Sequence, residues 1–265
     1  MRVFLTGGSG YIGAAVVTAL VQHGHEPFAL ARSESAATRV TALGATPVPG
    51  ELGQLDVLRE AAASADAAIH LAETGAQADL AAAEAILAGL GDRPYVHSGG
   101  VWVYGDTSQF IDESAPQSPP PLVAWRAANE RTVLDSGHAV LVLPGVVYGR
   151  EERLVKLLSE PAEGHYIGDG GNHWAVVHVD DIAQLYVLAL SAPAGRSFAG
   201  VDNRQSPTMR EIAEAVNPRS ASITITQAEQ EWGPLAAAFA LDQRISSARA
   251  RDELGWRPTA PLLVG

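Results

Sequence analysis

Short, wholly apolar runs alternate with helical patterns through the first 150 residues, and this alternation constrains the fold most strongly. The predicted strands are the runs RVFLT, EPFALA, TPVPG, DAAIHLA, PYVHSG and AVLVLPGVVYG, the last taken as one strand over 139–149. Strands that are apolar on every position belong to a parallel sheet whose two faces are both covered by helices. With right-handed crossovers, the sequence predicts an α/β fold with a Rossmann-like, doubly wound parallel sheet.

The regular alternation of predicted strands and helices ends after Tyr148. A helix is expected over 150–160, a Gly-rich loop over 168–174, a helix over 180–190, and short elements after that. We interpret this part as a small mixed α/β C-terminal lobe. The predicted division is a Rossmann domain over 1–150 with a return segment at about 173–202, and a small substrate-binding lobe made of 151–172 and 203–265.

Charge and composition exclude several classes of partner. Eighteen Lys and Arg against thirty Asp and Glu give a net charge of −12, which repels nucleic acids and anionic lipids. No signal peptide and no membrane-spanning run is expected, and the absence of cysteine fits a reducing compartment. The sequence therefore predicts a cytoplasmic protein with a small-molecule substrate and neither a nucleic acid nor a membrane as partner.

The segment TGGSGYIG follows the first predicted strand and opens the first predicted helix. Gly7, Gly10 and Gly13 permit a tight turn and the close approach of a pyrophosphate to the helix N-terminus, where free N–H groups favour negative charge. This placement predicts a dinucleotide-binding turn, to which Tyr11 and Ile12 also belong.

The end of the second predicted strand bears on the choice of dinucleotide. A carboxylate there binds the ribose 2′-hydroxyl of NAD, whereas a cation accepts the 2′-phosphate of NADP. Here the strand is followed by Arg32 and Ser33, with Glu34 close by and Arg39 further along the next helix. The sequence favours NADP(H), so residues 1–150 are predicted to be an NADP-binding domain.

Several further segments resemble, in order, those of extended short-chain dehydrogenases/reductases of the NAD-dependent epimerase/dehydratase type: TGGSGYIG, PGEL, HLAE, VWVYGD, LPGVVYGR, VHVDDIA and LGWRP. The resemblance covers nearly the whole chain and implies the Rossmann-like fold and a nicotinamide cofactor. It also implies cofactor contacts from residues outside the Gly-rich turn: Glu51, Leu52, Leu71, Ala72, Ser98, Pro144, Gly145 and Val146. Family members often pair through helices of the main domain, which leaves a homodimer open.

The catalytic residues usual in this family are replaced. Aligning on Glu130 puts Arg126 where the family has Lys and Leu122 where it has the proton-donating Tyr, and it puts Gly100 at the Ser and Asp79 at the Asn position. Leucine cannot donate a proton, and arginine keeps its own. Arg126 is therefore predicted to face the cofactor, binding ribose hydroxyls or stabilising an oxyanion. An ion pair of Arg126 with Glu130 or Asp79 stays as the alternative.

A reductase of this kind needs another proton donor. The catalytic candidates are Arg126 as the electrostatic group, with Asp79 and Tyr104 as donors, and His70, His173 and water as weaker candidates. Three tryptophans could line an apolar pocket: Trp102, Trp125 and Trp174.

The segment VHVDDIA could suggest a metal site through His178, Asp180 and Asp181. It is better interpreted as a helix start, with Asp180 or Asp181 accepting N–H bonds of the first turn, so no metal site is predicted.

Three functions are compatible with these residues. The first is an NADPH-dependent oxidoreductase that reduces a small apolar carbonyl, imine or activated double bond. The second is a redox-silent NADP(H)-binding sensor, because each usual catalytic group is replaced. The third is an isomerase or lyase that retains its cofactor.

Overall fold

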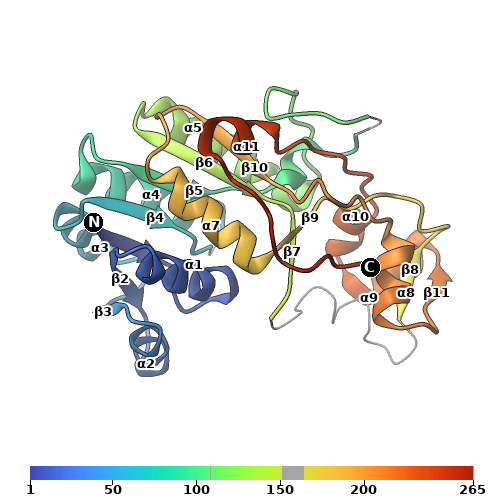
Figure 1. Cartoon of the computed structure of the whole chain (residues 1–265), viewed down its shortest axis with the longest axis horizontal. Helices are drawn as coiled ribbons and strands as arrows, with labels where there is room; N and C mark the ends of the chain where they lie inside the picture. The colour runs from blue at the N-terminus through green and yellow to red at the C-terminus, as the bar shows by residue number, and fades with distance from the viewer. Residues whose placement is uncertain (74, 108, 151–163, 265) are drawn as a thin grey trace.

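The computed structural model describes residues 1–73, 75–107, 109–150 and 164–264, and its centre is a seven-stranded parallel sheet (Figure 1). Across the sheet the strands are β10 (Ser197–Gly200), β6 (Ala139–Pro144), β5 (Tyr95–Ser98), β4 (Ala67–His70), β1 (Arg2–Thr6), β2 (Glu26–Ala31) and β3 (Thr46–Pro49). The order reverses between β4 and β1, the point at which doubly wound sheets bind ligands. The predicted fold class is confirmed.

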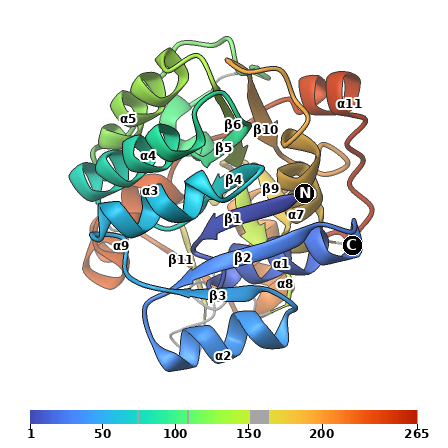
Figure 2. The ribbon, with the colours of Figure 1, turned by 90° about the vertical axis from the view of Figure 1, so that its left-hand side faces the viewer.

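Helices cover both faces of this sheet, as Figure 2 shows along the strands. In β1, Val3 and Leu5 pack toward α1 (Tyr11–Gln22) and α7 (Val179–Ala189). Phe4 points the other way, into the core formed with α3 (Leu55–Ala63), α4 (Ala76–Leu90) and α5 (Ala124–Asp135). Helix α2 (Glu34–Ala42) packs beside β2 and β3. Burial on both faces explains why these strands lack polar alternation.

The prediction of one strand over 139–149 is wrong, because the chain changes sheets at Gly145. Strand β6 ends at Pro144, and β7 (Val146–Tyr148) pairs instead with β9 (Val176–His178). Pro144 has no N–H to donate. The Gly145 N–H bonds the Gly200 oxygen at 3.0 Å, and a Cβ on Gly145 would lie 2.4 Å from the Ala175 oxygen. A residue without a side chain is therefore required where the chain passes between the sheets.

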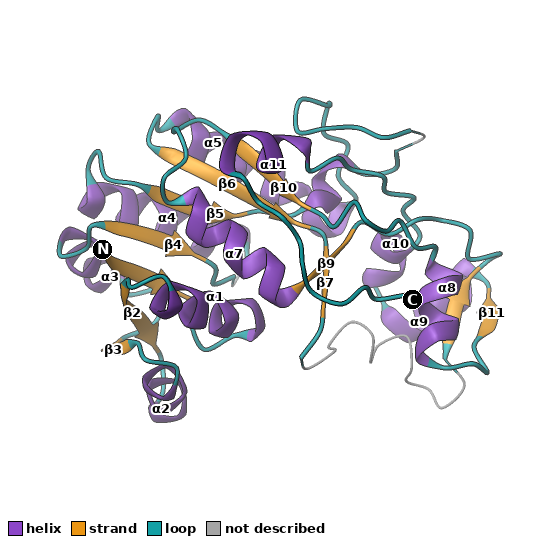
Figure 3. Cartoon of the chain, viewed as in Figure 1, coloured by secondary structure: helices purple, strands orange, loops and turns teal. Residues whose placement is uncertain are grey.

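A second lobe lies beyond β7 and β9 (Figure 3). It contains β8 (His165–Ile167), α8 (Met209–Val216), β11 (Ala221–Ile223), α9 (Ile225–Trp232) and α10 (Leu235–Phe239). Its core gathers around Phe239, whose ring centroid lies 5.1 Å from that of Trp174 and 5.4 Å from that of Trp232. The helix predicted over 150–160 falls largely on 151–163, outside the described residues. The exact extent of each lobe stays a prediction.

The C-terminal segment returns to the main sheet. Helix α11 (Ala248–Leu254) packs against α7 and β10, and the buried indole of Trp256 donates to the Asp181 oxygen at 2.8 Å. The expectation of a helix start in VHVDDIA holds, but the capping residue is His178, whose Nδ1 accepts the Asp180 N–H. The Asp181 carboxylate accepts N–H bonds from Thr259 and Ala260 instead. Among the helices within the described ranges, none has the length and apolar character needed to cross a membrane.

Candidate functional site

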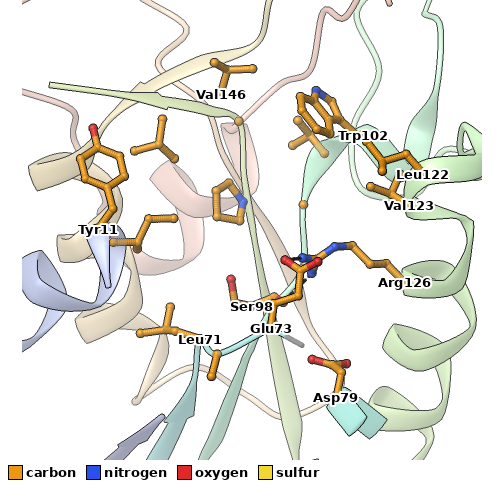
Figure 4. A pocket seen from close by; sticks show the side chains of 18 of the residues that line it. Tyr11, Leu71, Glu73, Asp79, Ser98, Trp102, Leu122, Val123, Arg126 and Val146 are labelled. Atoms are coloured by element: carbon orange, nitrogen blue, oxygen red, sulfur yellow. Dashed lines mark hydrogen bonds and ion pairs between the residues drawn. The ribbon is translucent and has the colours of Figure 1, made fainter. Parts of the chain in front are cut away.

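A cavity of about 850 Å³ opens at the carboxyl ends of β4, β5 and β6, between the main sheet and the second lobe (Figure 4). Its walls come from α1, the segment after β4, the 3₁₀ turn Val101–Tyr104, the start of α5, the β6–β7 junction and α10. Nine of the predicted site residues from the cofactor set line it: Tyr11, Ile12, Leu71, Ala72, Ser98, Arg126, Pro144, Gly145 and Val146. The structure thus brings segments from distant parts of the chain into one space.

The predicted dinucleotide turn has the geometry that a pyrophosphate requires. Helix α1 begins after Gly10 with no side-chain cap and with no acidic residue in its first turn. A Cβ on Gly10 would meet only the Gly7 oxygen, at 3.2 Å, so the space above the helix N-terminus stays open. A Cβ on Gly13 would lie 2.0 Å from the same oxygen. Uncapped N–H groups under an open surface fit a bound phosphate.

The predicted adenosine residues lie outside the cavity wall. Arg32 is exposed directly after β2, and Ser33 caps α2 by accepting the Ala36 N–H. Glu51 is exposed after β3, while Leu52 is buried. These four residues follow two adjacent strands of the sheet, in the direction in which a dinucleotide would extend from the Gly-rich turn.

Arg126 lines the cavity, and its ion pair is formed with Glu73. The guanidinium Nη2 bonds the Glu73 carboxylate, and Nη1 lies 3.4 Å from the Ser98 carbonyl oxygen. The Trp125 ring lies 4.7 Å from the guanidinium carbon. The side chain of Arg126 is mostly buried, whereas that of Glu73 is half exposed. The alternative prediction, an ion pair of Arg126 with Glu130 or Asp79, is therefore wrong. Glu73 was not identified as a partner from the sequence.

The start of α5 forms an apolar wall beside Arg126. Pro121 opens a short 3₁₀ turn, Pro121–Val123, that leads into α5. Leu122 and Val123 line the cavity together with Trp102, facing Ser98 across it (Figure 4). Of the three tryptophans considered, Trp102 lines the cavity, Trp174 belongs to the second-lobe core and Trp125 stacks on Arg126.

Asp79 forms one wall of the cavity and is held as an anion by buried polar groups. The Thr6 hydroxyl accepts the Leu71 and Ala72 N–H groups and so donates to Nδ1 of His70, 2.7 Å away. That arrangement leaves the His70 proton on Nε2, 3.4 Å from Asp79 Oδ1. Asn129 donates to Oδ2 at 3.0 Å.

The balance of these contacts decides the proton state of Asp79. Burial acts to raise the pKa of Asp79, but the N–H of His70 that faces the carboxylate and the hydrogen bond from Asn129 outweigh burial and lower the pKa below its usual value. His97 Nε2 lies 3.8 Å from the carboxylate, and burial lowers the pKa of His97 to about 3, so this imidazole is neutral. Asp79 therefore lacks the raised pKa that a proton donor needs.

The other predicted proton donors lie away from the cavity wall. The Tyr104 hydroxyl points to the Glu113 carbonyl oxygen at 3.4 Å, and burial raises the pKa of Tyr104. His173 is paired with Asp242 at 3.0 Å in the second lobe, and His70 is buried behind Asp79. The positions of these residues give no support to a proton-donating role.

Glu130 is a buried carboxylic acid under the floor of the cavity. Its side chain is 2% exposed, and Oε1 has no hydrogen-bond partner. Gln117 Nε2 lies 3.4 Å from Oε2, and a Cβ on Gly99 would lie 2.3 Å from Oε1. Burial raises the pKa of Glu130 to about 7, against the lowering effect of the Arg126 charge.

This pKa predicts a stability that depends on pH. The folded state binds the Glu130 proton more tightly than the unfolded chain, where the pKa is near 4.5. The stability due to the bound proton is therefore complete below pH 4.5 and is lost as the pH rises through about 7. Across this pH range the free energy of unfolding of the wild type should fall by about 3 kcal/mol because of Glu130, and Glu130→Gln should not show this fall.

Urea unfolding at several pH values between these limits measures this loss. Glu84→Gln, which changes an exposed carboxylate on α4, should retain the wild-type pH profile. Parallel profiles for Glu130→Gln and wild type would show that Glu130 ionises in the folded state as it does in water.

One cavity contact joins residues that the sequence did not connect. Ser98 Oγ, at the end of β5, lies 2.5 Å from the hydroxyl of Tyr186 on α7. Tyr186 is completely buried, and burial raises the pKa of Tyr186. The one available signal was a polar side chain on the otherwise apolar face of the helix predicted over 180–190.

Comparisons with known proteins agree with this geometry. The model of the NAD dependent epimerase/dehydratase family matches residues 3–199. An uncharacterized protein of Schizosaccharomyces pombe is 30% identical over all of this chain and 97% of its own length. A ketoreductase of Stigmatella aurantiaca that acts on a farnesyl dihydroquinoline oxide is 34% identical over 75% of this chain and 67% of its own.

The solved structure of a dTDP-glucose 4,6-dehydratase from Streptomyces venezuelae with NAD bound superposes with a TM-score of 0.80. It is 21% identical, over 98% of this chain and 93% of its own, so it supports the fold alone. The family match covers most of the chain, including the dinucleotide turn, the β4–β5 edge and Arg126. The chain is therefore an oxidoreductase that belongs to the NAD-dependent epimerase/dehydratase family of extended short-chain dehydrogenases/reductases.

Proposed function

We propose that this protein is an NADPH-dependent reductase of a small apolar carbonyl compound, imine or activated double bond. The observation that carries the proposal is the composition of the cavity wall. Among the described residues that line it, apolar side chains surround one cation, Arg126, and two carboxylates, Glu73 and Asp79, and the cavity adjoins a dinucleotide turn with an uncapped helix end. Bound NADPH would supply hydride, and the protein would contribute positioning and electrostatics.

The end of β2 supports NADPH over NADH. β2 ends at Ala31, and Arg32 follows with its side chain exposed. No carboxylate stands at the end of this strand, where NAD-binding members of the fold hold the ribose 2′-hydroxyl. A 2′-phosphate placed there would meet a guanidinium and the Ser33 hydroxyl.

The charges in the cavity support an apolar substrate over a nucleotide sugar. Arg126 is the one cation among the described lining residues, and it is already paired with Glu73. A sugar diphosphate would need cations that are not already paired. The walls at the start of α5, at the β6–β7 junction and at α10 are instead made of Leu122, Val123, Val146 and Leu235, which suit a compact apolar ketone.

The test of cofactor choice is a titration with NADPH and NADH followed by nicotinamide fluorescence. Arg32→Ala should weaken NADPH binding by about 10- to 100-fold, the worth of a charge-assisted hydrogen bond, and leave NADH binding unchanged. Arg59→Ala, which removes an exposed arginine paired with Asp56 on α3, should change neither affinity. Equal affinity of wild type for the two cofactors would contradict the NADPH assignment.

The test of reduction is NADPH oxidation over a panel of apolar ketones, aldehydes and imines. Product formed in equal amount to the NADPH oxidised supports the proposal. Tight NADPH binding with no turnover across the panel would overturn it in favour of a redox-silent binding protein. Product formed with no NADPH consumed would overturn it in favour of an isomerase or lyase.

A further inference from the structure

The contact between Ser98 and Tyr186 bears on the missing proton donor. Ser98 ends β5 and lines the cavity, and Tyr186 reaches it from α7, on the face of the sheet opposite α5. The two hydroxyl oxygens are 2.5 Å apart. Leu122, where the family has its tyrosine, lines the same cavity (Figure 4). A tyrosine hydroxyl is therefore present beside the cavity, but it comes from a different helix.

The direction of this hydrogen bond follows from burial. The Tyr186 hydroxyl is fully buried, and among the hydrogen bonds of the described residues Ser98 Oγ is its one partner. A buried O–H group without an acceptor is costly, so Tyr186 donates and Ser98 accepts. The hydrogen of Ser98 is then free to point away from Tyr186. Because Ser98 lines the cavity, that hydrogen is available to a ligand in it.

A positive charge lies next to this pair. Arg126 Nη1 is 3.4 Å from the Ser98 carbonyl oxygen. Burial raises the pKa of Tyr186, and the bond to Ser98 and the Arg126 charge act against that rise. A cation beside a proton donor stabilises the negative charge that develops as the proton leaves. Arg126 thus occupies a position beside the Ser98–Tyr186 pair that complements its role toward the cofactor.

We propose that Ser98 contacts the reacting oxygen or nitrogen of the substrate and gives it a proton, and that Tyr186 positions Ser98 and replaces that proton. The proposal rests on the reduction proposed above. It changes the predicted role of Ser98 from a cofactor contact to a catalytic residue, and it makes Tyr186 a positioning residue.

The proposed step balances for a ketone as follows. Bound NADPH would supply the hydride for the new C–H bond, and the electron pair of the C=O π bond would move to oxygen. This oxygen takes the Ser98 proton as Ser98 takes the Tyr186 proton, so an alcohol, NADP⁺ and a Tyr186 phenolate result. After the alcohol leaves, one proton from the solvent reaches the Tyr186 phenolate through water in the cavity and the Ser98 hydroxyl, which restores both hydroxyl groups.

The first experiment measures NADPH oxidation by wild type and three variants with the best ketone of the panel. Ser98→Ala should lower kcat about 100-fold and Tyr186→Phe about tenfold, with NADPH affinity retained. The double variant should be no slower than Ser98→Ala, because Tyr186 acts through Ser98. Ser98→Thr, which keeps a hydroxyl, should recover part of the rate. The solvent deuterium isotope effect on kcat should be smaller in Tyr186→Phe than in wild type.

Tyr148→Phe is the matched control. Tyr148 is also buried, and its hydroxyl bonds the Pro261 oxygen and Gln205 away from the cavity wall. This variant should keep the wild-type kcat and isotope effect. Losses that multiply in the double variant, or wild-type kinetics in Tyr186→Phe, would overturn the proposal.

A second readout does not need turnover. Dimethylaminocinnamaldehyde absorbs at longer wavelength when its carbonyl is polarised, and in the NADP⁺ complex it cannot be reduced. The band should shift in wild type and shift less in Ser98→Ala. An equal shift in both proteins would overturn the Ser98 assignment. A band shift in a protein that reduces no compound of the panel would support the Ser98 contact and reject the proposed reduction.

Discussion

Gly13→Ala is expected to abolish tight dinucleotide binding. A Cβ on Gly13 would lie 2.0 Å from the Gly7 oxygen and 2.9 Å from the Gly8 Cα, and these atoms are backbone that no side-chain rotation can move away. The turn must shift by about 1 Å, and the loss of one hydrogen bond to the charged pyrophosphate would lower cofactor affinity by on the order of 100-fold. Overpacking of this kind also costs about 3 kcal/mol of stability. Fluorescence titration with NADPH and urea unfolding measure the two effects.

Gly24→Ala separates the two effects, because Gly24 lies just beyond the other end of α1. It has a φ of +73°, and a Cβ there would have no atom within 4 Å. The strained backbone should cost about 1 kcal/mol, and NADPH affinity should stay at the wild-type value. Wild-type NADPH affinity in Gly13→Ala would mean that the dinucleotide does not lie on this turn.

Arg126→Ala is expected to lower kcat by about 100-fold or more, the usual effect of removing one group that stabilises a developing oxyanion. The variant leaves Glu73 without its cation at the edge of the cavity, so carbonyl substrates would meet a carboxylate in place of an ion pair. Burial would then keep the Glu130 pKa high without the opposing effect of Arg126. Steady-state kinetics with NADPH and the best compound of the panel test this result.

Two further variants identify which property of Arg126 matters. Arg126→Lys keeps the charge and loses the planar fork, so it should recover a part of the activity if charge is what counts. Arg131→Ala removes an exposed arginine from the same helix and should leave kcat unchanged. If Arg126→Ala has wild-type kcat and cofactor affinity, the central site assignment is wrong.

The main sheet could be predicted because its signals are local. Unbroken apolar runs mark buried parallel strands, and the glycine pattern after β1 marks the nucleotide turn. The change of sheets at Gly145 could not be predicted, because AVLVLPGVVYG is apolar on both sides of the break. The acceptor that draws the chain away from the main sheet is the Ala175 oxygen, which lies just before β9 and is brought to Val146 only by folding.

Contacts within the site were hidden for the same reason. Arg126 and Glu73 are 53 residues apart in the sequence, and Ser98 and Tyr186 are 88 apart. The spacing of four residues correctly predicted that Arg126 and Leu122 lie on the same side of the helix. Spacing within one helix could not predict that Glu73, from another part of the chain, is the ion-pair partner of Arg126. The charge of Asp79 depends on His70 and Asn129, which come from a strand and a helix that meet only in the folded protein.

The crossing at Gly145 also ties one wall of the cavity to both sheets. The backbone of residues 144–148 first ends β6 at the cavity wall and then forms β7, which pairs with β9 at the edge of the second lobe. Hydrogen bonds from Gly145 to Gly200 and from Val146 to Ala175 fix this stretch on both sides. This wall of the cavity therefore belongs to two sheets at once, and a side chain at Gly145, whose Cβ would lie 2.4 Å from the Ala175 oxygen, would disturb the pairing of β7 with β9 and the cavity wall together.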